Sequence, residues 1–197
     1  MHRFFAPALD PGDETVLLPR DEAEHLTRVL RLGIGDTVAV FDGRGREFLA
    51  RVASADRRDV RVQLLSRVEP PPEPTVPLTL AQAVLKGEKM DEVIRDAVML
   101  GVAAVQPIVT RRTEVTVAAL VRGARVDRWR RVALASAKQS RRAVLPEVRM
   151  PLTFDNYARF FANQTYLKLA GSTILHTAIL MVVTGVLGYC IAYFLTM

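Results

Sequence analysis

The chain has 197 residues, a formal net charge of +6 and one cysteine, Cys190, which excludes a disulfide framework and fits a reducing compartment. Charges and prolines near the N-terminus interrupt the apolar run that a signal peptide needs, so we expect residues 1–150 to stay in the cytoplasm. The charge is uneven, because residues 73–150 hold 14 Lys and Arg against 8 Asp and Glu, and this favours a polyanionic partner over a general role in solubility.

Short β-type runs punctuate the first 70 residues and predict a small β-barrel. The runs are residues 15–18, 37–41, 47–52 and 60–65. The Gly-rich segment 42–46 joins the middle two runs and is typical of a hairpin connection. One helix interrupts the strands, with Asp21 as its expected N-cap. Its apolar face is formed by Leu26, Val29 and Leu30.

The proline-rich segment 69–74 predicts a stiff linker and a domain boundary. Beyond it the pattern changes to a strand over 78–84, a helix that ends at Gly101, and a strand over 102–109. Such a βαβ unit normally forms a parallel sheet. A further helix is expected over about 126–139. Its predicted buried residues are Trp129, Val132, Ala133 and Ser136.

An apolar run of about 22 residues, 174–195, closes the sequence and is long enough at 1.5 Å per residue to cross a hydrocarbon core of about 30 Å. No charged residue follows Lys168. Because Arg159 and Lys168 precede the run, the positive-inside rule places its N-terminal side in the cytoplasm. The alternative is a helix buried in the core of a soluble domain.

Ordinary catalytic constellations are missing from the sequence. The three histidines, His2, His25 and His176, are far apart, and with a single cysteine there is no spacing typical of metal ligands, so we predict no metal site. The glycine-containing segments 43–45 and 85–89 match no nucleotide-binding fingerprint.

Basic residues gather instead at the ends of the predicted elements of the βαβ region. Lys86 and Lys89 flank the turn into the first helix, where backbone N–H groups add to the attraction for a phosphate. Arg111 and Arg112 follow the second strand, at the carboxyl edge where open α/β sheets bind ligands. A third group ends the next helix, and its members are Lys138, Gln139, Arg141 and Arg142. Each group alone suits a solvated face, but three around one unit favour an anionic ligand.

Taken in order, several motifs resemble the RsmE family of methyltransferases, which modify N3 of a uridine in small-subunit (16S) ribosomal RNA. The motifs are HLTRVLRL at 25–32, FDG at 41–43, KGEKM at 86–90, LGV at 100–102, Pro107 with Arg111-Arg112, QSRR at 139–142 and Pro146-Glu147. The resemblance implies an α/β fold with a PUA-like barrel (1–70), a proline-rich linker (71–76), a partial SPOUT methyltransferase domain of the trefoil-knot type (77–150) and a permease-like segment (151–197). It also implies a homodimer that acts on ribosomal RNA in the small subunit, with S-adenosylmethionine as methyl donor.

The resemblance assigns roles to the basic residues. Arg112 and Arg141 are the expected catalytic cations, because uridine N3 must lose its proton and a cation near N3 and O4 stabilises the resulting anion. The expected RNA-binding residues are Arg28, Arg31, Lys86, Lys89, Arg111, Lys138, Gln139 and Arg142. One departure is local: the family commonly has an acidic residue where this chain has Lys138.

The larger departure lies beyond residue 150. The family's Gly-Pro-Glu-Gly-Gly loop and its later Leu-Arg-x-Glu-Thr-Ala segment, which build the cofactor pocket, do not occur in this sequence. Residues 152–197 instead resemble the first membrane helix of a polyamine-type ABC-transporter permease. The leading interpretation is an S-adenosylmethionine-dependent 16S rRNA uridine-N3 methyltransferase that lacks its cofactor-binding C-terminal part. We expect this chain not to transfer a methyl group by itself. The alternatives are an inactive RNA-binding fusion and a permease fragment with a cytoplasmic extension.

Overall fold

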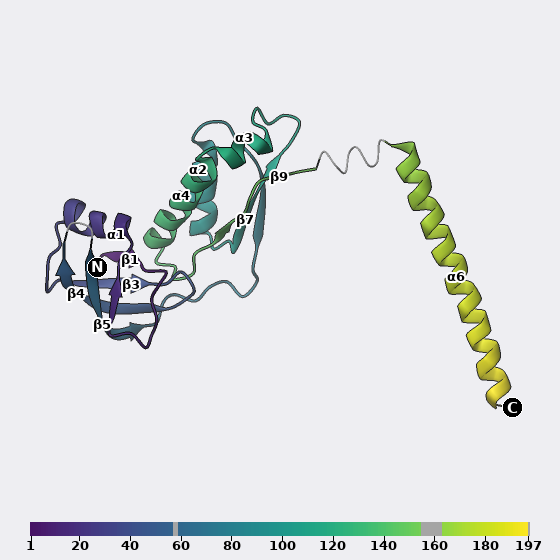
Figure 1. Ribbon diagram of the computed structural model, residues 1–197, viewed down its shortest axis with the longest axis horizontal. Coiled ribbons are helices and arrows are strands. Elements are labelled where there is room, and N and C mark those ends of the chain that lie inside the picture. The colour runs from purple at the N-terminus through teal and green to yellow at the C-terminus, as the bar shows by residue number, and fades with distance from the viewer. Residues whose placement is uncertain (57–58, 155–162, 197) are drawn as a thin grey trace. The chain divides into compact units, whose positions relative to one another are not determined.

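The computed structural model describes residues 1–56, 59–154 and 163–196. The chain divides into two compact units, Met1–Leu152 and Thr153–Met197. Both are drawn in Figure 1. The expected mixed α/β architecture with a C-terminal apolar helix is confirmed.

The first unit begins with a curled five-stranded sheet whose order is β1-β3-β4-β5-β2. Its strands are β1 (Arg3–Phe5), β2 (Thr15–Leu17), β3 (Thr37–Phe41), β4 (Glu47–Ala55) and β5 (Val60–Val68). β1 runs parallel to β3, and the other pairs are antiparallel. Two irregularities in the β4–β5 register bend these long strands. The four predicted strands are confirmed, whereas β1 was not predicted because three residues carry no readable alternation.

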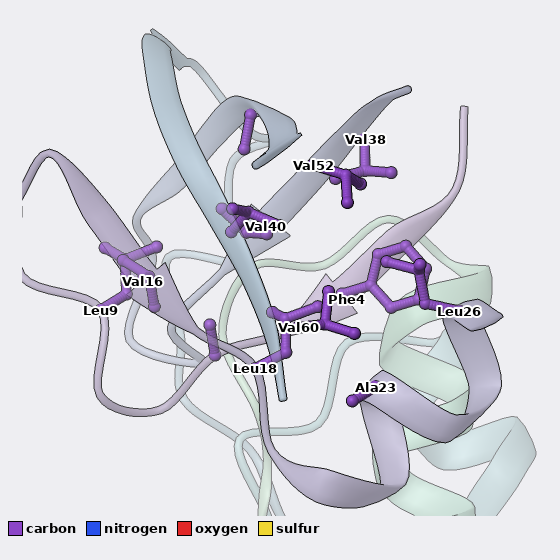
Figure 2. Packing of buried hydrophobic residues seen from close by; sticks show 13 residues of the cluster. Phe4, Leu9, Val16, Leu18, Ala23, Leu26, Val38, Val40, Val52 and Val60 are labelled. Atoms are coloured by element: carbon purple, nitrogen blue, oxygen red, sulfur yellow. The ribbon is translucent and has the colours of Figure 1, made fainter. Parts of the chain in front are cut away.

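Alternating side chains of the curled sheet form the first hydrophobic core. Val38, Val40, Val52 and Val60 are fully buried or nearly so, and Phe4 of β1 fills the space beside them. Figure 2 shows these side chains converging from separate strands, with Leu26 and Ala23 of the helical segment closing one side. The helical segment therefore covers one side of this core.

That helical segment differs from the prediction in two details. Helix α1 (Arg20–Glu24) has Pro19 as its N-cap and no side-chain capping bond, so the expectation that Asp21 is the N-cap is wrong; Asp21 lies in the first turn. The helix continues as a π-helix, η1 (His25–Val29). Because a π-helix has more residues per turn than an α-helix, Val29 rotates away from the core and is 66% exposed, although Leu26 is buried as predicted.

The second half of unit 1 is the predicted βαβ unit with additions. It consists of β6 (Thr79–Ala83), α2 (Lys89–Met99), β7 (Ala104–Val109), α3 (Val117–Arg122), α4 (Arg125–Gln139) and β8 (Glu147–Val148). β6, β7 and β8 are parallel, which confirms the predicted sheet type. The short elements α3 and β8 were not predicted. A further two-residue strand, β9 (Leu152–Thr153), lies where the two units join.

Helices α2 and α4 lie side by side in Figure 1 and build the second core. Met90, Ile94 and Val98 of α2 pack with Trp129 and Ala133 of α4 and with buried residues of the sheet. The predicted burial of Trp129, Ala133 and Ser136 is confirmed, and Val132 is half-buried.

The proline-rich segment is fixed to the α/β half of the unit. Glu73 accepts hydrogen bonds from Nε and Nη2 of Arg142. Backbone bonds also cross from the β3–β4 hairpin, where Gly45 donates to the Ala143 carbonyl at 3.1 Å and Leu145 donates to the Gly43 carbonyl at 2.8 Å. These contacts hold the sheet and the βαβ half together as one unit.

The second unit contains α6 (Gln164–Thr196), a helix of 33 residues. The window Leu167–Tyr189 has a mean hydropathy of 1.8, and none of it is buried within the described structure. Within the described residues, α6 is therefore not covered by other parts of the chain. Arg159, one of the two charges that orient the predicted span, lies outside the described residues.

Candidate functional site

A cavity of about 440 Å³, the Lys86 cavity, lies against the segments that leave the carboxyl ends of β6 and β7. Its lining residues are Val84, Leu85, Lys86, Gly87, Arg112, Thr113, Glu114, Val115 and Arg125. β6 and β7 are parallel neighbours, which is why the two segments after them meet at one edge of the sheet. The prediction from sequence that Lys86 and Arg112 follow adjacent strand ends agrees with this geometry.

The Lys86 cavity is electropositive. Lys86 forms an exposed ion pair with Glu114 at 3.1 Å. Arg112 and Arg125 make no ion pair within the described residues, so two guanidinium charges stay uncompensated beside the cavity. Arg125 was not predicted as a site residue, since an exposed arginine in a first helical turn carries no sequence signal that separates it from ordinary surface.

Arg128, one turn further along α4, is committed to a structural role. It contacts Glu88 at 3.3 Å and Asp91 at 2.5 Å, and thereby ties α4 to the start of α2. The hydrogen bond that Arg128 donates to Glu88 and the negative charge of Asp91 raise the pKa of Arg128 above its ordinary value. Lys89, the first residue of α2, and Arg111 are both exposed near the same edge but do not line the cavity.

A second cavity of about 380 Å³, the His25 cavity, lies between β1, the η1 helix and the end of α4. Its lining residues are Met1, His2, Arg3, His25, Leu30, Ala135, Lys138, Gln139 and Arg141. It unites three predicted site residues, Lys138, Gln139 and Arg141, with two histidines that the sequence places 23 positions apart. Those histidines were missed because only the pairing of β1 with β3 brings residue 2 beside this helix.

Arg141 occupies a backbone position that normally favours glycine. It follows the C-cap of α4 with φ of 60°, and the flanking N–H groups of Arg141 and Arg142 bond to the carbonyls of Lys138 and Ala137 in a Schellman arrangement. Helix α2 ends in the same way with Gly101 at φ of 97°. A non-glycine residue in this region costs about 1–2 kcal/mol, and such residues cluster at functional sites.

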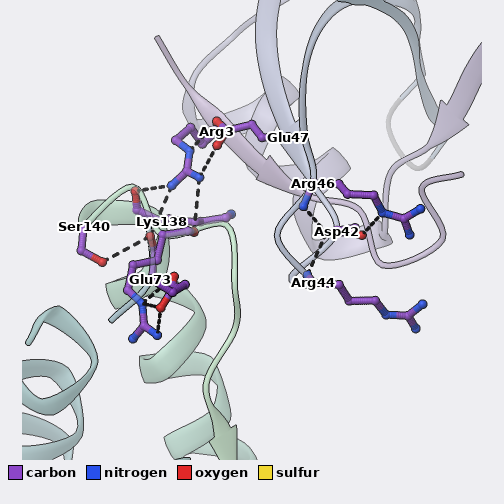
Figure 3. A network of polar contacts seen from close by, with 10 residues as sticks. Arg3, Asp42, Arg44, Arg46, Glu47, Glu73, Lys138 and Ser140 are labelled. Atoms are coloured by element: carbon purple, nitrogen blue, oxygen red, sulfur yellow. Dashed lines mark hydrogen bonds and ion pairs between the residues drawn. The ribbon is translucent and has the colours of Figure 1, made fainter. Parts of the chain in front are cut away.

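Arg3 holds the end of α4 in place. Its guanidinium donates to the carbonyls of Ala137 and Lys138 at 3.3 and 3.1 Å, while Nε and Nη2 bond to Glu47 at 2.9 and 2.8 Å. Figure 3 shows Arg3 between Glu47 and the end of this helix. The first strand of the curled sheet therefore fixes the backbone from which Arg141 projects.

Two predicted RNA-binding residues are occupied by structural contacts. Arg142 is buried and donates to Glu73 and to the carbonyls of Val98 and Val102, so the expectation that it faces RNA is corrected: the side chain fills the protein interior. Lys138 borders the His25 cavity, but its ammonium bonds to both carboxylate oxygens of Glu22. Its charge is therefore neutralised within the protein.

The remaining predicted residues are distributed over separate surfaces. Arg28 is exposed and 3.8 Å from Glu24, and Arg31 is exposed with φ of 54° after η1. Arg112 lines the Lys86 cavity, whereas Arg141 lines the His25 cavity. The two arginines predicted as a catalytic pair are thus placed in different cavities.

Two family models match the chain. The model described as an RNA methyltransferase domain matches residues 71–178, and the model described as an RNA methyltransferase PUA domain matches residues 18–65. The first match covers the βαβ half of unit 1 and extends into the second unit as far as residue 178, and the second match falls within the curled-sheet half of unit 1.

Curated proteins and solved structures give the same result. Ribosomal RNA small subunit methyltransferase E of Synechocystis sp. is 36% identical over 170 residues, which cover 85% of this chain and 54% of that protein. The protein of the same name from Mycobacterium tuberculosis is 33% identical over 149 residues, which cover 74% of this chain and 55% of that protein. The chain therefore spans about half the length of these relatives.

Two solved relatives, each 28% identical with a TM-score of 0.73, cover 80% of this chain. One is a ribosomal RNA small subunit methyltransferase E from Neisseria gonorrhoeae bound to S-adenosyl methionine, of which 64% is matched. The other is a putative methyltransferase from Legionella pneumophila in complex with the same cofactor, of which 65% is matched.

Proposed function

The chain belongs to the RsmE family of RNA methyltransferases, and from this premise we propose that it binds 16S ribosomal RNA for methylation of a uridine at N3, with S-adenosylmethionine as methyl donor. The curled sheet would act as a PUA-like RNA-binding domain, and the βαβ half as the RNA-facing part of a SPOUT domain. Residues 71–76 would link them. We also propose the homodimer that the family implies.

The Lys86 cavity is the observation that carries this proposal. Arg112 and Arg125 are uncompensated cations at the carboxyl edge of a parallel sheet, where α/β folds bind ligands. Guanidinium groups stay charged and present planar donor pairs that suit phosphate and carbonyl oxygens. Lys89 and Arg111 lie exposed at the same edge and extend the basic surface.

Arg112 is the better candidate of the two proposed catalytic arginines. N3 of uridine becomes nucleophilic only after losing its proton, and the negative charge then spreads to the neighbouring carbonyl oxygens. A guanidinium held beside N3 and O4 stabilises that charge, and such electrostatic effects are often the largest in enzyme catalysis. Arg112 lies at the sheet edge, whereas Arg141 lies in the cavity between β1 and α4.

Neither the Lys86 cavity nor the His25 cavity fits the methyl donor. S-adenosylmethionine carries a sulfonium cation, and basic side chains line both cavities. The one acidic residue that lines the Lys86 cavity, Glu114, is paired with Lys86. Because the sulfonium cation and the basic side chains repel each other, we assign these two cavities to RNA binding. The contacts to the donor belong to residues other than those that line them.

Crosslinking with mapping of the joined peptides tests the proposal. The full chain, in detergent micelles because of α6, is irradiated with 16S rRNA, and the crosslinked peptides are identified by mass spectrometry. We expect peptides that contain Lys86 and Arg112. Crosslinks confined to the exposed prolines of the linker, such as Pro71, would contradict the proposal.

A methyl-transfer assay on unmodified small subunits adds a second reading. With labelled S-adenosylmethionine and the purified chain alone, incorporation should stay at background, because no transition state forms without a bound donor. Incorporation that Arg112→Ala abolishes would show that the chain holds the donor after all and would overturn the expectation that the chain alone does not transfer a methyl group.

Helix α6 supports a second proposal, association with a membrane. Leu167–Tyr189 is long and apolar enough to span a bilayer, and its side chains are unburied in the described structure. We propose that this helix anchors the chain with residues 1–150 in the cytoplasm.

A further inference from the structure

We propose that the His25 cavity is a second phosphate site, in which His2 and His25 strengthen the binding of an RNA backbone phosphate as the pH falls. This inference rests on the proposed RNA-binding function and goes beyond it, because it assigns two unassigned residues and a pH dependence. The site is built by three segments that are far apart in the sequence: the N-terminal strand, the η1 helix and the end of α4.

The ring of Phe4 contacts residues of two of these segments. The imidazole of His25 lies edge-on to the ring of Phe4, with centroids 6.3 Å apart and an interplanar angle of 61°. The ammonium of Lys138 lies 5.7 Å from the centroid of the same ring. Phe4 is completely buried, so His25 and the end of α4 are both packed against a fixed part of the core.

Most of the charged residues around the cavity are paired, so the protonation of the histidines has a large effect on its net charge. Arg3 is paired with Glu47, and Lys138 is paired with Glu22, so these two cations are compensated. On helix α1, Glu24 is paired with Arg20 and Arg28, and Asp21 is exposed without an ion pair among the described residues. Among the described residues, these pairings leave Arg141 and the amino group of Met1 as the lining cations without an ion pair.

Two protonated imidazoles would add two positive charges to those of Arg141 and the Met1 amino group. Histidine is the side chain whose ordinary titration falls between pH 5 and pH 8. His2 and His25 are both exposed. Protonation of these two residues would therefore strengthen the attraction of the cavity for an anion.

A backbone phosphate of RNA is the anion that fits this geometry. Protonated imidazoles and the Arg141 guanidinium supply N–H donors, and the Gln139 amide adds a neutral donor, which together match the acceptor-only oxygens of a phosphodiester. Arg28 and Arg31 lie exposed on and after η1, so an extended strand that enters the cavity meets further cations beyond it. An isolated small anion would leave those arginines unused.

The test is the pH dependence of RNA affinity at constant ionic strength. The full chain in uncharged detergent is titrated into a fluorescein-labelled single-stranded fragment of 16S rRNA between about pH 5.5 and about pH 8, the range in which histidine titrates. If bound RNA raises the pKa of each histidine by about half a unit, the two effects together should raise the affinity about tenfold towards the acidic end. The double variant His2→Gln with His25→Gln should lose this rise, and the control His176→Gln, changed on α6, should keep it.

The outcomes separate this inference from the proposed function. RNA binding that is independent of pH, or a pH dependence that survives the double variant, overturns the inference and leaves the proposed function intact. No RNA binding at any pH overturns both. Should the double variant fail to fold, imidazole NMR signals of the wild-type chain decide: RNA must shift those of His2 and His25 and leave that of His176 unchanged. Shifts caused by anionic lipid nanodiscs and not by RNA would also overturn the proposal.

Discussion

Lys138 of α4 donates to both carboxylate oxygens of Glu22 at 2.5 and 2.6 Å, and this ion pair joins the βαβ half of unit 1 to the helix that covers the curled sheet. Glu22 is buried, and the Lys138 side chain is only 22% exposed. The pair also accounts for the local departure from the family pattern, because a lysine at 138 is matched here by an acid at 22.

Removing one partner of this pair should be costly. Lys138→Ala leaves the Glu22 carboxylate buried without compensation, which should lower the free energy of unfolding by about 3 kcal/mol. Urea unfolding followed by the fluorescence of Trp129, the single tryptophan and a buried core residue of α4, measures the change. The double variant Glu22→Leu with Lys138→Met should recover most of the loss.

The matched control is Lys86→Ala. Its ion pair with Glu114 is largely exposed, 81% and 66% for the two side chains, so the effect on unfolding should stay below about 1 kcal/mol. Equal losses for Lys86→Ala and Lys138→Ala would contradict the structural role of the Glu22 pair.

The hairpin between β3 and β4 should depend on the ionised form of Asp42. Its carboxylate accepts from the N–H groups of Arg44 and Arg46 at 2.7 and 3.0 Å and from Nε of Arg46 at 2.6 Å (Figure 3). Burial alone would raise the pKa of Asp42, but these hydrogen bonds and the Arg46 charge together lower it below the ordinary value. The charged form therefore stabilises the fold above the ordinary pKa, and this contribution is lost as the pH falls through the lowered one.

Asp42→Asn should accordingly destabilise the protein by about 1–2 kcal/mol at neutral pH, because an amide N–H₂ group would face the Nε–H of Arg46. It should also reduce the loss of stability in acid. Asp59→Asn, at an exposed position, is the control, with an expected change within about 0.5 kcal/mol. An acid-induced loss that is unchanged in Asp42→Asn would argue against this account of the hairpin.

Arg141 should show a conflict between stability and binding. Arg141→Gly relieves a left-handed backbone conformation and should raise the free energy of unfolding by about 1 kcal/mol, whereas Arg141→Ala keeps the strain. Both variants remove the guanidinium and should weaken RNA binding to the same degree. A glycine variant that binds RNA as tightly as the wild type would remove Arg141 from the site.

Helix α6 should carry the chain into the membrane fraction. Because Lys168 precedes the apolar part of the span and no charge follows it, the N-terminal side should stay in the cytoplasm. Fractionation with alkaline extraction measures the insertion, and protease added to intact cells should leave unit 1 uncut. Recovery of the full chain in the soluble fraction without detergent would contradict the anchoring proposal.

The regular elements could be predicted from the sequence because their apolar residues repeat with a period of two or about 3.6. The hairpin and the end of α2 could be predicted from Gly43, Gly45 and Gly101, which adopt the positive φ angles that glycine favours. The π-helical turn at His25–Val29 could not be predicted, since it changes the period within a single turn. β1 was too short to carry a pattern, and its position depends on pairing with a strand 36 residues away in register.

The candidate site was less predictable than the fold. Sequence identified basic clusters but could not separate exposed charges from paired ones, so Arg142 and Lys138 were grouped with Arg141 although Glu73 and Glu22 occupy them. Those partners lie 69 and 116 residues away. Long-range pairs of this kind are fixed by tertiary packing and leave no periodic trace along the chain.

The salt dependence of RNA binding tests the central claim most directly. For the full chain in uncharged detergent and a 16S rRNA fragment, the logarithm of affinity should fall steeply and linearly with the logarithm of salt concentration. Arg112→Ala and Arg125→Ala, which change the Lys86 cavity, should each make the slope shallower by about one unit, while Arg61→Ala on the outside of the curled sheet should not change it. An affinity that does not respond to salt, or a slope that Arg112→Ala and Arg125→Ala leave unchanged, would contradict the assignment of this cavity to RNA.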